Sequence, residues 1–332
     1  MTGQTSVQVS APVGDDAVRP FQAEGLDVRG RAVQLGPALD ALLSRHDYPA
    51  AVSRLVGEAT VLTALLGASL KFDGRFILQT QTDGPVSMLV VDFRTPGDIR
   101  AYASFDEEAV GRAVEAGEAS AGQLLGTGTL GMTIDQGADT TRYQGIVALE
   151  GESLEEVAHT YFRQSEQIPT RVRLAASEML VRGDGETRSF WRAGGVLAQF
   201  MPAVTERMPR EDLPGGDDPN AEAASSNDED ESWREARMLI ETIEDHELLD
   251  PDVPVERLLY RLFHERGVRV YDAAPIRDKC SCSRERIENV LNSFTAEAIE
   301  ESVEDGVIKV KCEFCGTAYE FDPDRFRGSG EA

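Results

Sequence analysis

The chain is 332 residues long, and 59 acidic against 33 basic side chains give it a formal net charge of −26. This length allows a sizeable core and predicts two domains. The negative charge argues against contacts with the phosphates of DNA or RNA. No apolar run approaches the length of a membrane span, and the N-terminus lacks the pattern of a secretory signal. We therefore expect a cytoplasmic protein without nucleic-acid or membrane partners.

The first two hundred residues predict one α+β domain, residues 21–205, that follows a disordered extension over residues 1–20. Apolar residues recur on one face of Pro49–Lys71, which predicts a central helix. A capping box at Ser153 predicts a second helix, as far as Phe162. Short alternating runs separated by turn residues indicate a mainly antiparallel sheet. The predicted strands are Leu26–Leu35, Arg75–Thr82, Val86–Phe93, Ile99–Ser104, Leu124–Asp135, Arg142–Leu149, Val172–Val181 and Phe190–Met201.

The composition changes in the following segment, residues 206–231. Within it, Leu213–Glu231 is acidic and contains no basic or aromatic residue, which predicts a flexible linker. Residues 232–265 predict a helical linker region with two helices. One starts at the capping box of Ser232 and reaches about Glu247, and the other covers Val255–His264 with an apolar stripe.

The only four cysteines lie in residues 266–325, as the tight pairs Cys280-Ser281-Cys282 and Cys312-Glu313-Phe314-Cys315. Ser283 and Thr295 are predicted to cap two helices between the pairs, and Val307–Val310 is predicted to be a strand that leads into the second pair. Clustered thiols in a reducing compartment indicate metal binding or redox chemistry, and four thiolates form the ligand set of a closed zinc site. A module with so few apolar residues would also need a metal for its stability.

Two other roles remain open for these cysteines, structural disulfides and a zinc ion that is only structural. If the site does bind zinc, an oxidant that converts the thiolates to disulfides would expel the metal and remove its contribution to folding. The module would then unfold, and the neighbouring helices would lose their support.

Other patterns predict no catalytic residues. The run from Gly126 to Gly131 has the spacing of a dinucleotide fingerprint, but a strand-like sequence follows it where that motif needs a helix. The four histidines are scattered, without metal spacing, and nothing marks a nucleophile. Each histidine is interpreted as exposed or hydrogen bonded.

With these residues in view, the chain resembles the heat shock protein 33 family, the redox-regulated molecular chaperones, over about Phe21 to Phe321. The resemblance includes both cysteine pairs, the first continuing as Ser283-Arg284-Glu285-Arg286 and the second as Gly316. The other matching motifs are His46-Asp47-Tyr48-Pro49, Leu70-Lys71-Phe72-Asp73-Gly74, Arg142-Tyr143-Gln144-Gly145, Tyr161-Phe162-Arg163-Gln164-Ser165-Glu166-Gln167 with Pro169-Thr170, and Gly194-Gly195 with Met201-Pro202.

The resemblance implies a holdase chaperone that needs no ATP and is not an enzyme. In the reduced form Cys280, Cys282, Cys312 and Cys315 would hold one Zn²⁺, and the chain would be an inactive monomer. Oxidation would pair Cys280 with Cys282 and Cys312 with Cys315, release the metal, unfold the linker helices and yield a homodimer that holds unfolding or oxidatively damaged clients. Thiol reductants would then let these clients pass to ATP-dependent refolding chaperones, in a stress response of the cytoplasm.

One departure from the family pattern is the acidic stretch Leu213–Glu231, which looks longer than usual and leaves the activation threshold open. An alternative from another class is an enzyme with a structural zinc module and an active site in the N-terminal domain. That hypothesis predicts turnover that does not depend on cysteine oxidation.

Overall fold

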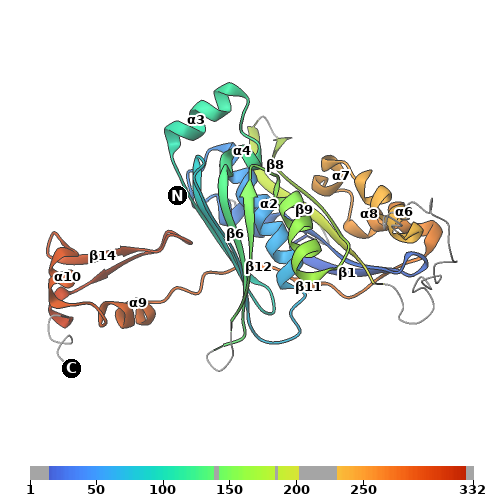
Figure 1. The fold of residues 1–332 in the computed structure, drawn as a ribbon. Helices are drawn as coiled ribbons and strands as arrows, with labels where there is room; N and C mark the ends of the chain where they lie inside the picture. The colour runs from blue at the N-terminus through green and yellow to red at the C-terminus, as the bar shows by residue number, and fades with distance from the viewer. Residues whose placement is uncertain (1–14, 138–141, 184–185, 202–229, 327–332) are drawn as a thin grey trace, which may run out of the picture.

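A computed structural model describes residues 15–137, 142–183, 186–201 and 230–326. It has a mixed α+β fold with two large sheets and a small third one, and their strands are antiparallel except for one pair (Figure 1). The first sheet has the order β10-β1-β2-β9-β8, with β11 also paired to β1, and the second has the order β12-β5-β4-β3-β6-β7. The third sheet, β13-β14-β15, lies in the cysteine module.

The strands of the first sheet are β1 (Ala17–Ala23), β2 (Val28–Leu35), β8 (Thr170–Gly183), β9 (Glu186–Phe200), β10 (Val268–Val270) and β11 (Ala274–Pro275). Those of the second are β3 (Arg75–Thr82), β4 (Val86–Arg94), β5 (Asp98–Phe105), β6 (Thr127–Asp135), β7 (Tyr143–Glu150) and β12 (Arg277–Asp278). Those of the third are β13 (Val303–Glu304), β14 (Val307–Lys311) and β15 (Ala318–Phe321).

The α-helices are α1 (Pro37–Leu43), α2 (Ala50–Gly67), α3 (Glu107–Ala116), α4 (Ala121–Leu125), α5 (Leu154–Tyr161), α6 (Glu231–Glu241), α7 (Asp245–Leu249), α8 (Val255–Phe263), α9 (Arg284–Leu291) and α10 (Ala296–Glu301). Short 3-10 turns lie at Glu24–Leu26, His264–Arg266 and Pro323–Arg325, and a π-helical turn lies at Phe162–Glu166.

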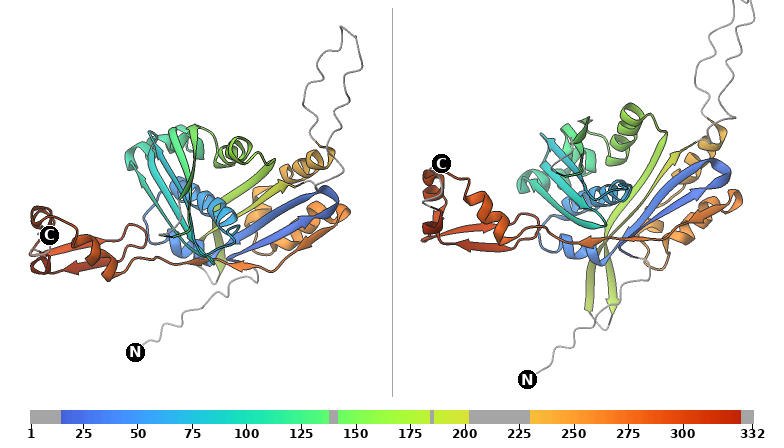
Figure 2. Two further views of the ribbon diagram at one scale, coloured as in Figure 1. Left: turned by 60° about the horizontal axis from the view of Figure 1, so that its bottom comes forward. Right: turned by 90° about the horizontal axis from the view of Figure 1, so that it is seen from below.

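Helix α2 is the central element of the N-terminal domain and contacts strands of both large sheets (Figure 2). Its small residues allow this close packing: a Cβ on Gly57 would lie 2.8 Å from the Cβ of Ala176. By length and composition alone α2 would suffice to cross a membrane, which corrects the expectation that no run approaches that length. Because 78% of the helix is buried inside the protein, its apolar character is that of a core helix.

The helices α6, α7 and α8 cover the face of the first sheet that points away from α2 (Figure 2). Their apolar stripes meet inward-facing residues of β1, β2 and β9, and the rings of Phe21 and Phe263 stack 5.7 Å apart. The contact forms a second core that is separate from the one around α2. Its fully or nearly fully buried members include Phe21, Val28, Ala32, Val196, Trp233, Ile240, Leu248, Leu258, Leu259 and Phe263.

The segment between α8 and the first cysteine is paired with both large sheets. β10 and β11 add to β1, and β12 then forms the one parallel pair, with β5. The cysteine module follows and lies to one side of the two sheets (Figure 1). Its own core is small, with the buried residues Leu291, Ile299, Ile308, Phe321 and Phe326.

Several predicted boundaries are wrong. Strand β1 begins at Ala17, inside the expected N-terminal extension; Pro20 obscured it, but its carbonyl accepts a hydrogen bond from the amide of Tyr271. The start of the predicted strand Leu124–Asp135 belongs to α4, which Ser120 and Gln123 open with a capping box.

The first linker helix is also shorter than predicted. Asp230, and not Ser232, is the N-cap of α6, because its carboxylate accepts from the amide of Ser232. The helix ends at Glu241, and a new capping box of Glu244 and Glu247 opens α7. Of the acidic stretch Leu213–Glu231, residues 213–229 lie outside the described part of the chain.

Candidate metal centre

The first cysteine pair lies between a strand and a helix. Cys280 follows β12 after one residue, Lys279, and Cys282 precedes Ser283, which is the N-cap of α9 as predicted. The hydroxyl of Ser283 accepts from the amide of Arg286 at 3.2 Å. The backbone of this pair is therefore fixed on one side by pairing with β5 and on the other by a capped helix.

The second pair lies on a tight turn after β14. The amide of Gly316 donates to the carbonyl of Cys312 at 2.8 Å, and the amide of Cys312 donates to the carbonyl of Thr317 at 2.9 Å. Gly316 has φ +69°, a left-handed conformation that glycine adopts without steric cost. This turn aims Cys312 and Cys315 at the same point, as the two-residue spacing predicts.

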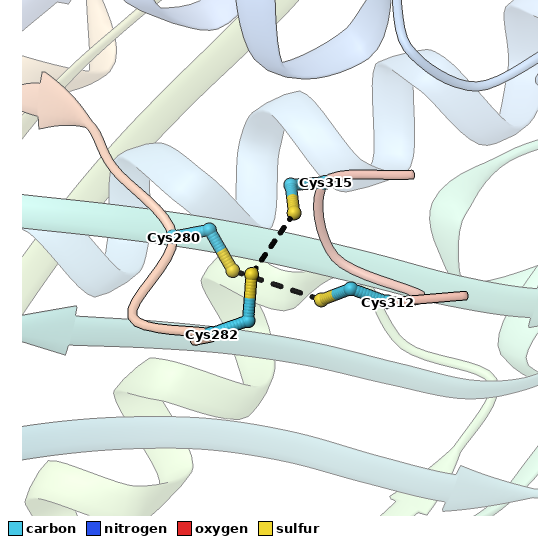
Figure 3. A group of neighbouring side chains, drawn as sticks. All are labelled: Cys280, Cys282, Cys312 and Cys315. Atoms are coloured by element: carbon cyan, nitrogen blue, oxygen red, sulfur yellow. Dashed lines mark hydrogen bonds between the residues drawn. The ribbon is translucent and has the colours of Figure 1, made fainter. Parts of the chain in front are cut away.

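The four sulfur atoms converge at one place (Figure 3), where all lie within 4.8 Å of one another. Cys280 Sγ is 3.7 Å from Cys312 Sγ, and Cys282 Sγ is 3.3 Å from Cys315 Sγ. A tetrahedral zinc site with bonds of about 2.3 Å places its sulfurs about 3.8 Å apart. The donor set and its spacing thus fit a Zn²⁺ ion. Within the described chain this is the only group of potential ligands that is close enough to hold a metal.

The environment separates the proton affinities of the thiols. Burial raises the pKa of Cys282 to about 12 and also raises that of Cys312. Burial likewise acts to raise the pKa of Cys315, but hydrogen bonds with Thr317 and with the neighbouring thiols outweigh it and lower this pKa to about 6. Cys315 therefore ionises more readily than Cys282 and Cys312.

The cysteine module also contacts the second large sheet through Arg100, which the sequence did not point to, and the segment between α1 and α2 through His46, which the sequence analysis named only as part of a matching motif. The guanidinium of Arg100, on β5, lies 4.1 Å from the ring centre of Phe314 and donates to Cys280 Sγ at 3.5 Å. His46 Nε2 is 3.3 Å from the carbonyl oxygen of Phe314. The position of Phe314 between Cys312 and Cys315 could have indicated a contact beside the site. No local pattern in the sequence indicates Arg100.

The glycine-rich run and the histidines have the structural roles that the sequence predicted. Most of the glycine-rich run Gly126–Gly131 lies in β6, and no helix follows it. His159 Nε2 accepts from the amide of Val172 at 2.8 Å, and His264 Nδ1 lies 3.0 Å from the carbonyl oxygen of Tyr260. These histidines have hydrogen-bonding roles within the described residues.

The fold and the site define a class: a two-sheet domain covered by linker helices and followed by a four-thiol module. A family model described as "Hsp33 protein" matches residues 16–322. The 33 kDa chaperonin of Caulobacter vibrioides (strain NA1000 / CB15N) is 46% identical over 322 residues, which cover 96% of this chain and 99% of that protein. The 33 kDa chaperonin of Serratia proteamaculans (strain 568) is 34% identical over 308 residues, 92% of each chain.

Among solved structures, the 33 kDa chaperonin (heat shock protein 33 homolog) from Thermotoga maritima matches with a TM-score of 0.69 and 21% identity, over 94% of this chain and 96% of that one. This likeness confirms the fold. The chain belongs to the Hsp33 family of chaperones.

Proposed function

We propose that this chaperone is an ATP-independent holdase of the cytoplasm that oxidation activates, and that it has no enzymatic activity. One Zn²⁺, held by Cys280, Cys282, Cys312 and Cys315, would keep the reduced form inactive. The observation that carries the proposal is the convergence of all four thiols in a module with only a small core of its own. Such a module depends on its metal for a large part of its folding free energy.

Oxidation would remove the ligands themselves. Formation of each disulfide transfers two electrons from two thiolates to one hydrogen peroxide, which takes up two protons from solvent and becomes two waters. The two sulfurs then carry no charge that could hold a cation. By the family resemblance the pairs are Cys280 with Cys282 and Cys312 with Cys315. The close sulfur contacts of the reduced structure instead join Cys280 to Cys312 and Cys282 to Cys315. Disulfide formation would therefore require the two cysteine loops to rearrange and separate.

The segment that precedes the first cysteine connects the module to the linker helices, so unfolding of the module could spread to them along it. β12, β11 and β10 connect the module to α8, and each is a strand of two or three residues. Strands so short have little stability once the module that anchors them unfolds. Release of α6, α7 and α8 would expose their own apolar stripes and the face of β1, β2 and β9 that they cover.

The exposed surface is the proposed site for unfolded client proteins and for a second copy of the chain in an oxidised homodimer. Unfolded chains offer apolar segments, so binding needs apolar area and no fixed sequence. Thiol reductants would restore the metal-binding form, and the clients would then pass to ATP-dependent refolding chaperones.

The test is light scattering from a heat-unfolding client, mixed with the chain either reduced and zinc-loaded or pre-oxidised with peroxide under mild warming. We expect only the oxidised form to suppress aggregation. The double variant Cys312→Ser, Cys315→Ser should lose control by peroxide, whereas Ser281→Ala, which changes a neighbouring side chain without a thiol, should keep it. Unchanged peroxide activation in the double variant would refute the switch, and no suppression by either form would favour the enzyme hypothesis.

A further inference from the structure

A basic cavity lies beside the cysteine centre, between the module and the second large sheet. Its volume is about 300 Å³, which is near the lower end for small-molecule sites. Five basic and two acidic side chains line it, in a protein whose net charge is strongly negative. The basic residues are Arg75, Arg94, Arg100, Lys279 and Arg286, and the acidic ones are Asp92 and Asp98.

The two carboxylates do not neutralise this set. Asp92, which is 5% exposed, is shared by two cations, because it accepts hydrogen bonds from both Arg75 and Arg100. Asp98 is paired with Lys279 at 2.7 Å. Within the described residues, Arg94 and Arg286 form no ion pair, and both are exposed at the cavity. Cys280 also lines the cavity, and a Zn²⁺ ion with four thiolates would carry a net charge of −2, so the five cations exceed the two carboxylates and such a centre together by one charge.

The cations come from both sides of the interface. Arg75, Arg94 and Arg100 belong to β3, β4 and β5, whereas Lys279 and Arg286 belong to the module. Like charges that face each other at this range repel, and an anion between them would turn that repulsion into attraction. Helix α9 adds to the field, because Ser283, its N-cap, lines the cavity, and a helix N-terminus favours negative charge.

We propose that this cavity binds a small phosphate-bearing anion, which bridges the second sheet and the cysteine module and holds the module in its docked position. Arginine forks match phosphate oxygens in geometry and charge, and three of the lining arginines project from adjacent strands. Inorganic phosphate or a small phosphomonoester fits the volume. This site goes beyond the proposed oxidation switch, since ligand binding is a property of the reduced, folded protein.

The first experiment is calorimetric titration of the reduced, zinc-loaded chain with inorganic phosphate and, separately, with glycerol phosphate, at an ionic strength fixed with chloride. We expect each ligand to bind at one site. The ligand with the lower Kd shows whether the site prefers free phosphate or a phosphomonoester. Arg94→Ala and Arg286→Ala should each weaken binding by about tenfold, the worth of a charge-assisted hydrogen bond. Arg112→Ala, on exposed α3, is the matched control and should leave binding unchanged.

The second experiment measures the bridge itself. The amides of Arg277 and Lys279 donate to the carbonyls of Gly97 and Ile99, so their hydrogen exchange reports on docking. Phosphate should slow their exchange in the unaltered protein and in Arg112→Ala, but not in the two cavity variants. Absence of binding, binding that neither cavity variant weakens, or exchange that phosphate leaves unchanged would each overturn the proposal. None of these readouts depends on oxidation, so failure of the redox switch is a separate result.

Discussion

A half-buried carboxyl group on α2 has an unusual environment. The pKa of Glu58 is raised to about 7, mainly by burial and also by the charges of Glu155 and Asp245, against the opposing effect of Arg54 and Arg173. These residues line a cavity of about 320 Å³ where α2, α5 and the linker helix α7 meet. The ionised form of Glu58 is therefore disfavoured in the folded protein relative to the unfolded chain, where the pKa is near 4.5.

This environment makes stability depend on pH. Because the folded-state pKa is raised, the contribution of Glu58 is fully present below about pH 4.5 and is lost as the pH rises through 7. We expect Glu58→Gln to remove this loss. The difference in free energy of unfolding between the variant and the unaltered protein should therefore grow in favour of the variant by up to about 3 kcal/mol from pH 5 to pH 8. Urea unfolding at both pH values measures the effect, with Glu115→Gln, an exposed residue of α3, as control. An equal difference at both pH values would contradict the prediction.

The residues of the candidate metal centre were predictable to different degrees. Cys280 and Cys315 were found because thiols are few in this chain and their chemistry is specific, so spacing alone identified a site. Arg100 was not found, since it is one of 33 basic residues and lies beside Cys280 only through the pairing of β12 with β5. Periodicity and spacing carry no information about such a tertiary register.

The same division holds for whole elements. Helix α2 and the strands β3, β4 and β5 were predicted within a few residues, because their apolar periodicity and turns are local signals. The strands β10, β11 and β12 were not predicted. Each is two or three residues long and exists only because a neighbouring sheet offers an edge, so nothing in its own sequence distinguishes it from a loop.

The contact between α7 and the first sheet depends on a glycine. A Cβ on Gly194, in β9, would lie 2.4 Å from the carbonyl oxygen of Leu248 and 3.1 Å from its Cβ. Two hydrogen bonds hold this part of the backbone in place. Gln34 Nε2 donates to the Leu248 carbonyl at 3.3 Å, and Arg192 Nε donates to the Leu249 carbonyl at 2.7 Å. Only glycine lets the helix come this close to the strand.

We therefore expect Gly194→Ala to push α7 away from the sheet and to lower the free energy of unfolding by roughly 1–3 kcal/mol, the usual cost of overpacking. Hydrogen exchange should speed up in α6, α7 and α8 while β3 and β4 stay protected. Gly111→Ala is the matched control, because a Cβ there meets nothing within 4 Å. Unchanged exchange in the three linker helices would show that the contact is not a determinant of their docking.

At the scale of the whole molecule, three cores of very different size are arranged in series. The core around α2 contains most of the buried apolar residues, the linker helices share a second core with the first sheet, and the module has the third and smallest. The sequence predicted these parts but not their arrangement, since the connection through β10, β11 and β12 follows from pairing with two separate sheets. Stability should therefore decrease from the N-terminal domain toward the module.

Metal removal tests that order directly. Structural zinc supplies on the order of 10 kcal/mol to small modules, and the third core has only five buried residues to support the fold without it. We expect a chelator to abolish amide protection in α9, α10, β14 and β15 of the reduced protein, to lower it next in α8, and to leave β3 and β4 unchanged. Exchange measured by mass spectrometry, with excess zinc restored as the control, follows each segment separately.

The alternative outcomes of this experiment differ in what they say about the fold. If α9 and β14 kept their protection without metal, the apolar core of the module would be sufficient by itself, and its zinc would not be required for folding. If β3 and β4 lost protection together with the module, the protein would unfold as one cooperative unit, and oxidation of the cysteines would destroy the N-terminal domain with the rest. Only stepwise loss leaves a folded N-terminal domain, and the first sheet of that domain could then offer to another chain the face from which α6 to α8 have detached.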